Sequence, residues 1–247
     1  MMDQLVTDIC ALVRQCGKIM LSADRDAMRI DAKAGAANFV TEYDTWVQNA
    51  LHEGLKKLLP QAGFLGEEGE QTASAGEGLC FVVDPIDGTT NFIKDYHVSC
   101  ISVGLLRQGV PEIGVVYNPY LDEMFCAQRG QGAYCNGRPV HVSEEPLEKG
   151  LVLFGTSPYS RELAEKSFRM AYDYFRRALD IRRSGSAALD LCAVAAGRAE
   201  LYFELILQPW DYAAGALLVE EAGGRMTTVE GCPVTFDRPC SILARNK

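Results

Sequence analysis

The feature that most constrains this chain is an apolar run, residues 79–83, that leads directly into Asp-Pro-Ile-Asp-Gly-Thr-Thr-Asn-Phe at residues 84–92. The apolar run predicts a buried strand, so the chain leaves a sheet and at once presents two carboxylates. Two carboxylates three positions apart can both bind Mg²⁺ or Ca²⁺, and the glycine lets following N–H groups face an anion. An Asp-Pro turn explains the same residues, so this stretch alone leaves both interpretations open.

The rest of the chain predicts helices and sheets in both halves. Apolar residues recur at helical spacing in residues 5–20 and 46–59, and the second helix should end at Pro60. Residues 23–38 read as an exposed connection. Runs at 97–107, 112–117, 124–127 and 139–142 are separated by turn residues, which predicts an antiparallel sheet.

The second half has the alternation of an α/β protein. Strands are expected at residues 151–154, 179–182, 200–204, 226–229 and 241–244, with helices at 161–177, 187–196 and 212–222. We therefore expect a single domain over residues 1–247. Its charged, Pro-containing segment at 143–150 would separate a metal-binding half, 1–145, from an α/β half, 146–247, that completes the site.

Composition narrows the possible partners. The formal net charge of −9 argues against a nucleic-acid surface, and an acidic chain would repel a phosphorylated substrate unless bound cations reverse the local charge. Nine cysteines form no Cys-x-x-Cys pair and three histidines share no ligand spacing, so we expect reduced thiols in the cytoplasm and no zinc site. No stretch of the sequence reaches the run of about 18 apolar residues that a membrane span needs, so no membrane span is expected.

Several other residues have both a structural and a functional explanation. Thr41 or Asp44 could cap the second helix, and Asp211 is placed to cap a later one. The acids at 67–68 could be a solvated surface pair or a source of ligands. The loop at 183–187 could bind an anion at a helix N-terminus or only cap that helix. Lys33 stands in a loop where a lysine is usually just solvated. Taken one at a time, these residues do not establish a function.

Taken together, three motifs resemble the metal-binding signatures of the inositol monophosphatase family. They are Gly-Glu-Glu at 66–68, the stretch at 84–92, and Pro-Trp-Asp-Tyr-Ala-Ala-Gly at 209–215 followed by Glu-Ala-Gly-Gly at 221–224. The resemblance spans nearly the whole chain. It implies an α/β fold, a layered αβαβα sandwich with a largely antiparallel first sheet and a second mixed sheet, and a homodimer.

The resemblance also implies a metal centre of two to three Mg²⁺ ions. Glu67, Asp84 and the backbone carbonyl of Ile86 match the ligands of the first ion, while Asp84, Asp87 and Asp211 match those of the second. Glu67 would also help to hold a weaker third ion. Phosphate-ester hydrolysis needs charge stabilisation, a hydroxide-like nucleophile and neutralisation of the leaving alkoxide, and clustered carboxylates with Mg²⁺ supply all three.

Catalytic roles follow from the same resemblance. Asp44 and Thr89 match a pair that orients and deprotonates the attacking water, which predicts direct attack by water without a phosphoenzyme. The N–H groups of Gly88 and Thr89 would hold the phosphate. Lys33 matches a lysine on a mobile loop that closes near the metals.

On the alcohol side, Gly185, Ser186, Ala187 and Glu204 correspond to the inositol-facing positions of the family. The predicted activity is a Mg²⁺-dependent, lithium-sensitive hydrolysis of a small phosphate ester, most simply inositol 1-phosphate. Fructose 1,6-bisphosphate and nucleotide or NADP phosphates are alternatives on the same scaffold. A non-catalytic metal-binding regulatory module is an alternative of another class, although the Asp-x-Asp-x-Asp-Gly spacing of a calcium loop is absent.

Overall fold

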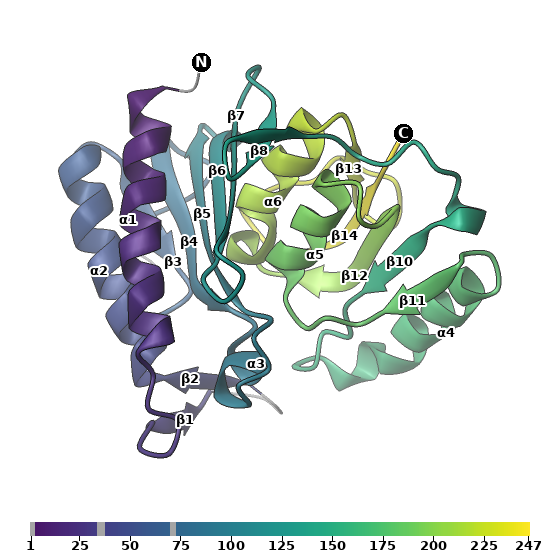
Figure 1. Ribbon diagram of the computed structural model, residues 1–247, viewed down its shortest axis with the longest axis horizontal. Coiled ribbons are helices and arrows are strands. Elements are labelled where there is room, and N and C mark those ends of the chain that lie inside the picture. Colours follow the sequence, from purple (N-terminus) through teal and green to yellow (C-terminus); the bar gives the residue numbers. More distant parts are fainter. Residues whose placement is uncertain (1–2, 34–37, 70–72) are drawn as a thin grey trace.

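The computed structural model describes residues 3–33, 38–69 and 73–247, and these residues form five layers (Figure 1). Helices α1 (Gln4–Leu21) and α2 (Glu42–Leu58) form the first layer and cover one face of a seven-stranded sheet. Helices α5 (Ala187–Ala195) and α6 (Pro209–Glu221) lie between that sheet and a five-stranded sheet. Helix α4 (Ala164–Phe175) covers the far side. The predicted αβαβα sandwich is confirmed.

The first sheet has the order β3-β4-β5-β6-β7-β8-β9, and only β3 and β4 are parallel neighbours. Its strands are β3 (Gly63–Gly66), β4 (Leu79–Asp87), β5 (Cys100–Arg107), β6 (Val110–Asn118), β7 (Glu123–Gln128), β8 (Ala133–Cys135) and β9 (Arg138–Val140). The largely antiparallel sheet was predicted. The prediction that the chain leaves the sheet after residue 83 was wrong, because β4 continues through Asp87 with an irregular register after Asp84.

The second sheet is mixed, as predicted, with the order β11-β10-β12-β14-β13. Strand β10 (Leu151–Phe154) is parallel to both β11 (Asp180–Arg182) and β12 (Leu201–Leu207). Strand β14 (Cys240–Arg245) is antiparallel to β12 and to β13 (Arg225–Thr227). A 3₁₀ turn, η1 (Leu147–Lys149), precedes β10, and another, η2 (Arg161–Leu163), leads into α4.

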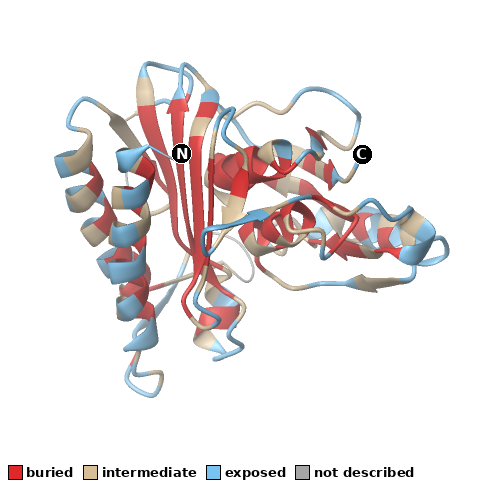
Figure 2. Ribbon diagram, turned by 45° about the horizontal axis from the view of Figure 1, so that its top comes forward, coloured by how far each residue is buried: buried red, intermediate tan, exposed pale blue. Residues whose placement is uncertain are grey.

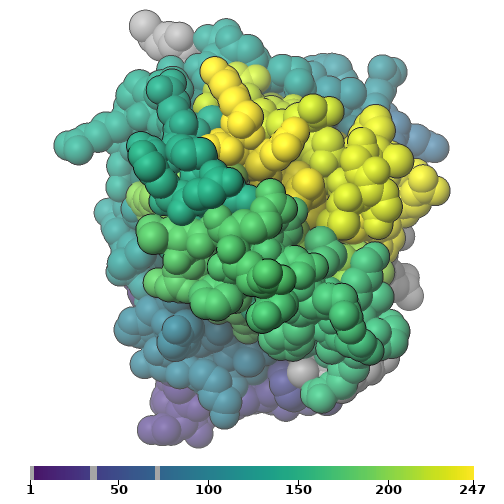
Figure 3. Space-filling view, turned by 90° about the vertical axis from the view of Figure 1, so that its right-hand side faces the viewer, coloured from purple at the N-terminus to yellow at the C-terminus, as the bar shows by residue number. Residues whose placement is uncertain are grey.

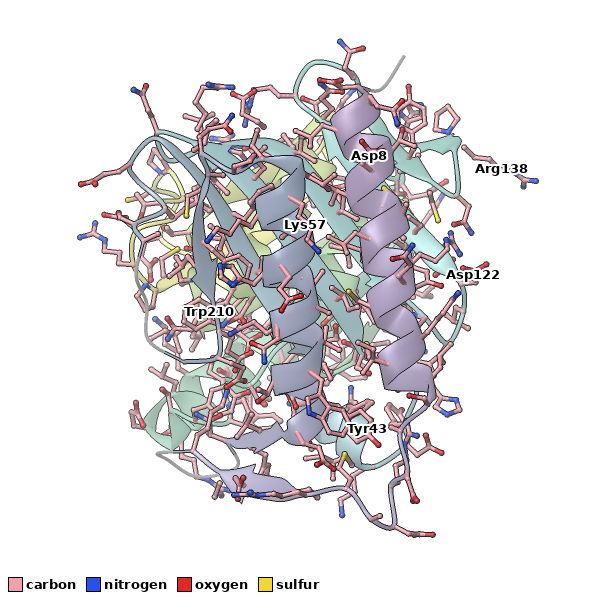
Figure 4. The ribbon with its side chains drawn as sticks, turned by 90° about the vertical axis from the view of Figure 1, so that its left-hand side faces the viewer. Asp8, Tyr43, Lys57, Asp122, Arg138 and Trp210 are labelled. Carbon is pink, nitrogen blue, oxygen red and sulfur yellow. The ribbon has the colours of Figure 1, made fainter. Side chains whose placement is uncertain are left out.

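The outer helices are amphipathic, whereas α6 is apolar on all sides, as expected for a helix between two sheets. Figure 2 shows the buried strands between the half-exposed outer helices, and Figure 4 shows α1 beside α2, with Tyr43 at the beginning of α2. Helix α6 packs so closely on the first sheet that a Cβ at Gly114 would lie 2.6 Å from the carbonyl oxygen of Ala214. Backbone therefore contacts backbone between these two layers.

Several short elements were not predicted. Strand β1 (Ile30–Ala32) lies within the segment 23–38 that was expected to be an exposed connection, and it pairs with β2 (Phe39–Thr41), which follows that segment; residues 34–37 lie outside the described residues. Helix α3 (Thr89–Ile93) follows β4 directly. Among the described residues, none of the helices is long and apolar enough to cross a bilayer.

Candidate metal-dependent active site

A cleft of about 420 Å³ lies between the two sheets, and every predicted site residue except Asp44 lines it. Its walls include Lys33, Glu67, Asp84, Ile86, Asp87, Gly88, Thr89, Gly185, Ser186, Ala187, Glu204 and Asp211. A larger cavity of about 690 Å³ lies between residues 141–147 and the end of the chain. Both acidic and basic residues line that cavity, so it has no large excess of one charge that would select a charged ligand.

The end of β4 places both aspartates of the central motif at the floor of the cleft. Asp84 is 2% exposed and accepts a hydrogen bond of 3.0 Å from the backbone N–H of Ile86. Gly88 then turns the chain with φ of +88°, and a Cβ at this position would lie 2.9 Å from the carbonyl oxygen of Val98. A side chain is therefore excluded at Gly88 on both conformational and steric grounds.

Asp87 is held from the other half of the chain. The Ser186 hydroxyl donates to its Oδ2 at 2.6 Å, and the Ala188 N–H donates to the same oxygen at 2.7 Å. Burial raises the pKa of Asp87 to about 6 despite these two donors. Since these bonds converge on Oδ2, they orient Oδ1 for another partner. The Ser186 hydroxyl thus acts on the site through Asp87.

Asp211 reaches the cleft from the beginning of α6. The prediction that Asp211 is the N-cap was wrong: Gln208 is the N-cap residue, and Asp211 lies three positions later. Its Oδ2 accepts the N–H of Gln208 at 2.7 Å. Pro209 occupies the first helical position, where its missing N–H costs nothing, so the turn that presents Asp211 is preorganised.

Glu67 follows β3 and faces the same cleft. The ammonium group of Lys33 lies 2.8 Å from Glu67 Oε1 and also forms an ion pair with Glu68. The N–H of Glu68 is in turn bonded to the Gln48 side chain at 2.9 Å. Lys33 therefore occupies the place of a cation beside a predicted metal ligand, and the acids at 67–68 are not a plain solvated surface pair.

The electrostatics of these acids favour bound cations. Burial, followed by the charges of neighbouring carboxylates, raises the pKa values of Asp84 and Asp211 well above the usual range. Within residues 3–33, 38–69 and 73–247, no three or more Asp, Glu, His or Cys side chains are grouped so that they alone could hold a metal ion. Mg²⁺ usually keeps several waters and takes one or two carboxylates plus phosphate oxygens, so this open oxygen donor set fits it.

Asp44 and Thr89 form a pair beside the acids. Of the two candidates for the N-cap of α2, Thr41 is the residue that caps the helix, and its N–H and hydroxyl donate to Asp44 Oδ2 at 2.7 and 2.5 Å. The Thr89 hydroxyl lies 3.3 Å from Asp44 Oδ1 and 3.1 Å from the carbonyl oxygen of Ile86. Burial raises the pKa of Asp44 to about 6. One carboxylate oxygen therefore caps a helix while the other faces Thr89.

The opposite wall is built around Glu204 in β12. Its Oε1 accepts the Ser157 N–H at 2.7 Å and its Oε2 accepts the Tyr202 hydroxyl at 2.7 Å. A Cβ at Gly155 would lie 1.8 Å from Glu204 Oε2, so only glycine fits there. Burial raises the pKa of Glu204, while the bonds from Tyr202 and Ser157 lower it. Glu204 is thus a fixed hydrogen-bond acceptor within the cleft.

Several cleft residues were not assigned roles from the sequence, and Asp190, Arg183 and Tyr159 are among them. Asp190 is 4% exposed and bonded to the Ser184 side chain, and an acid inside the apolar run of α5 was a signal for it. Arg183 lies close enough to lower the pKa of Glu204. Tyr159 also lines the cleft, although it is 58% exposed, and local sequence gave no signal for its position.

Two sheets that converge on clustered carboxylates, with a hydroxyl and an acid beside them, define a class of enzyme: the phosphatases that act on phosphate esters with the help of bound divalent cations. Comparison with known proteins gives the family. The sequence model of the inositol monophosphatase family matches residues 1–247.

Individual relatives agree with that match. An inositol-1-monophosphatase of Synechocystis is 40% identical over 220 residues, 88% of this chain and 76% of the relative. A Nus factor SuhB of Xylella fastidiosa is 37% identical over 85% of this chain and 78% of its own. The crystal structure of the extragenic suppressor protein suhB of Bartonella henselae superimposes with a TM-score of 0.93 at 34% identity, over 99% of this chain and 95% of that one. The chain belongs to the inositol monophosphatase family.

Proposed function

We propose that this enzyme hydrolyses inositol 1-phosphate to inositol and phosphate, with Mg²⁺ and without a phosphoenzyme. The observation that carries the proposal is the cluster of buried acids with raised pKa values beside the Asp44–Thr89 pair. Such a cluster is unstable as a set of bare carboxylates, and cations would stabilise it. The Synechocystis relative named inositol-1-monophosphatase supports the substrate.

The proposed ligands divide between two sites that share Asp84. Glu67, Asp84 and the Ile86 carbonyl would hold one ion, and Asp84, Asp87 and Asp211 another, with a third held weakly by Glu67. Bound Mg²⁺ would supply charge neutralisation at the phosphate oxygens and lower the pKa of a ligated water. The Ser186 and Ala188 donors fix Asp87 so that its Oδ1 is presented for this purpose.

Thr89 and Asp44 would prepare the water. When the Thr89 hydroxyl donates to Asp44 Oδ1, its oxygen lone pair is free to accept a proton from the attacking water. Thr41 holds Oδ2, so Oδ1 is the oxygen left to receive the proton that Thr89 relays. A hydroxyl in this position relays protons and does not attack phosphorus, hence the proposal of direct hydrolysis.

The other assignments concern binding. The N–H groups of Gly88 and Thr89, at the turn after β4, would hold the phosphate. Glu204 would accept hydrogen bonds from ring hydroxyls, next to the backbone of Gly185 and Ala187. Lys33, now paired with Glu67, would exchange this contact for the phosphate region when cations bind.

Phosphate release with Mg²⁺, with and without lithium, tests the proposal. The Asp84→Asn variant should lose on the order of a thousandfold in kcat, because it removes a ligand shared by two ions. Asp173→Asn, an exposed acid on α4, is the matched control and should retain full activity. Activity that survives Asp84→Asn, or that needs no divalent cation, would contradict the two-metal proposal.

The substrate is tested separately with a panel of esters compared by kcat/KM. Inositol 1-phosphate should be preferred over fructose 1,6-bisphosphate, NADP and adenosine 2′-phosphate. A hundredfold preference for one of the others would replace the substrate while leaving the metal chemistry in place. Equal rates on every ester would indicate that the wall around Glu204 does not distinguish between the alcohol groups of the substrates.

The homodimer and the cytoplasmic location also belong to this proposal. Exposed apolar side chains on and after α4 support a self-association surface: Phe168, Tyr172, Phe175 and Leu179 are 51–66% exposed. In Figure 3 the part of the chain around α4 lies at the surface that faces the viewer. Light scattering on the purified protein should give twice the 27.1 kDa chain mass, and a monomeric mass would contradict it. Nine cysteines without paired spacing suit a reducing cytoplasm.

A further inference from the structure

Tyr159 is a cleft residue that the mechanism above does not use. It lies in the connection between β10 and α4, which faces α3 across the cleft (Figure 1), and it lines that cleft together with Pro158 and Trp210. Its side chain is 58% exposed. A tyrosine combines an apolar ring with a polar tip, so an open tyrosine inside a substrate cleft is equipped to contact a ligand.

The turn that carries Tyr159 is hydrogen-bonded to Glu204, the acceptor proposed for the alcohol half of the substrate. Ser157, two residues earlier, is 2% exposed and has φ of +43°, a conformation that is unusual for a residue other than glycine. Its N–H and hydroxyl both donate to Glu204 Oε1, at 2.7 and 3.2 Å. Its hydroxyl also lies 3.0 Å from the carbonyl oxygen of Ile206. Hydrogen bonds to β12 therefore fix the turn that carries Tyr159.

The phenol also faces the acids of the metal centre. The surrounding protein, and then the charges of Asp211 and Glu67, raise the pKa of the Tyr159 hydroxyl far above its usual value. The Tyr159 side chain is 58% exposed, so the rise in pKa comes from neighbouring protein that surrounds the phenol only in part. The hydroxyl consequently remains a hydrogen-bond donor at every pH at which the enzyme would work.

We infer that Tyr159 is a specificity-determining residue for the alcohol half of the substrate, and that it favours esters of a cyclic polyol over esters of an acyclic one. The ring would pack against the C–H face of a cyclitol or sugar, while the hydroxyl donates to a substrate oxygen. Glu204, held by the same turn, accepts from ring hydroxyls on the other side. This inference rests on the proposed phosphatase function and names its substrate class more closely.

The test compares two esters that share the phosphate and differ in the alcohol: inositol 1-phosphate and glycerol 2-phosphate. Tyr159→Ala should lower kcat/KM for the inositol ester by about 10- to 100-fold, chiefly through KM, and change the glycerol ester by less than about threefold. Tyr159→Phe, which keeps the ring, should fall between the wild type and Tyr159→Ala. Tyr96→Ala, which removes a tyrosine that is 63% exposed and lies outside the cleft, is the matched control and should change neither ester.

Each other outcome overturns the inference. An equal loss on both esters would assign Tyr159 to the metal centre or to stability, and thermal unfolding of the variant separates those two. No change on either ester would make Tyr159 an ordinary surface residue. If the wild type released phosphate from neither ester, the proposed function would fail. Titration of inositol 1-phosphate against tryptophan fluorescence, with Trp46 replaced by Phe so that Trp210 alone reports, would then show whether Tyr159→Ala weakens binding. Unchanged binding would overturn the inference.

Discussion

Replacing Asp44 by Asn should make the metal-free protein more stable while it removes activity. Burial raises the pKa of this carboxyl from 3.8 to about 6, so ionising it in the folded state costs about 3 kcal/mol at ~1.4 kcal/mol per pH unit. Because the folded pKa is the higher one, the stability contributed by Asp44 is fully present below pH 3.8. It is lost as the pH rises through about 6.

The amide removes this cost but not all of the bonds. Thr41 and Thr89 contact both carboxylate oxygens, and an amide has only one acceptor oxygen, so about 1 kcal/mol of hydrogen bonding is lost. The net gain should be about 2 kcal/mol at pH 8, or roughly 4–8 °C in Tm for a chain of this size. At pH 4.5 the relieved cost is only about 1 kcal/mol, so the gain should vanish.

The assay is thermal unfolding in EDTA at pH 8 and pH 4.5, with Asp173→Asn, an exposed acid, as the control. Turnover with Mg²⁺ should fall by about 10²- to 10⁴-fold, because in the proposed mechanism Asp44 would receive the proton from water through Thr89. Excess Mg²⁺ should reduce the stability gain, since nearby cations lower the pKa of Asp44 in the wild type. A variant that is less stable than the wild type at pH 8, or that gains equally at both pH values, would refute this reasoning.

Three further predictions concern the surrounding residues. Ser186→Ala removes the donor 2.6 Å from Asp87 Oδ2, so the Mg²⁺ concentration for half-maximal activity should rise about 10-fold; an unchanged metal titration would contradict the positioning role. Gly155→Ala would force a Cβ into Glu204 and should cost about 1–3 kcal/mol in urea unfolding, along with kcat/KM for the inositol ester; unchanged stability would show that the wall yields. The wild-type kcat/KM should decline on the acid side at or below about pH 6 as Asp44 is protonated, and a profile flat to pH 4 would rule out Asp44 as the base.

Much of the fold was predictable because its signals are local. The helical spacing in residues 5–20 and the turn residues between the strands of the first sheet depend on neighbours in sequence, and both were confirmed. The three-residue strands β1 and β8 are too short for a periodic pattern, so they were missed. Strand β4 was predicted too short, because two buried carboxylates within a strand are unfavourable unless other parts of the chain compensate them.

The candidate site shows the same division. Its acids could be found from the motifs, and Thr41 was one of two candidates for the N-cap of α2. The N-cap Gln208, and the bonds that Asp44 and Asp211 make back to the N-cap residues three positions earlier, were not predicted. The position of Tyr159 depends on the bonds between Ser157 and Glu204, residues 47 positions apart. No pattern within the turn itself could reveal a contact of that range.

The close approach of α6 to the first sheet has a consequence for the chemistry. Gly104 and Gly114 face Ala213 and Ala214 in the helix whose beginning carries Asp211, with little side chain between the two layers. The distance between Asp211 and the acids of β4 is therefore set by contact between the two backbones. Side chains between the layers cannot change rotamer to compensate for a shift, because there is almost no side chain there. A methyl group added at Gly114, remote in sequence from every predicted ligand, would move one side of the metal centre relative to the other.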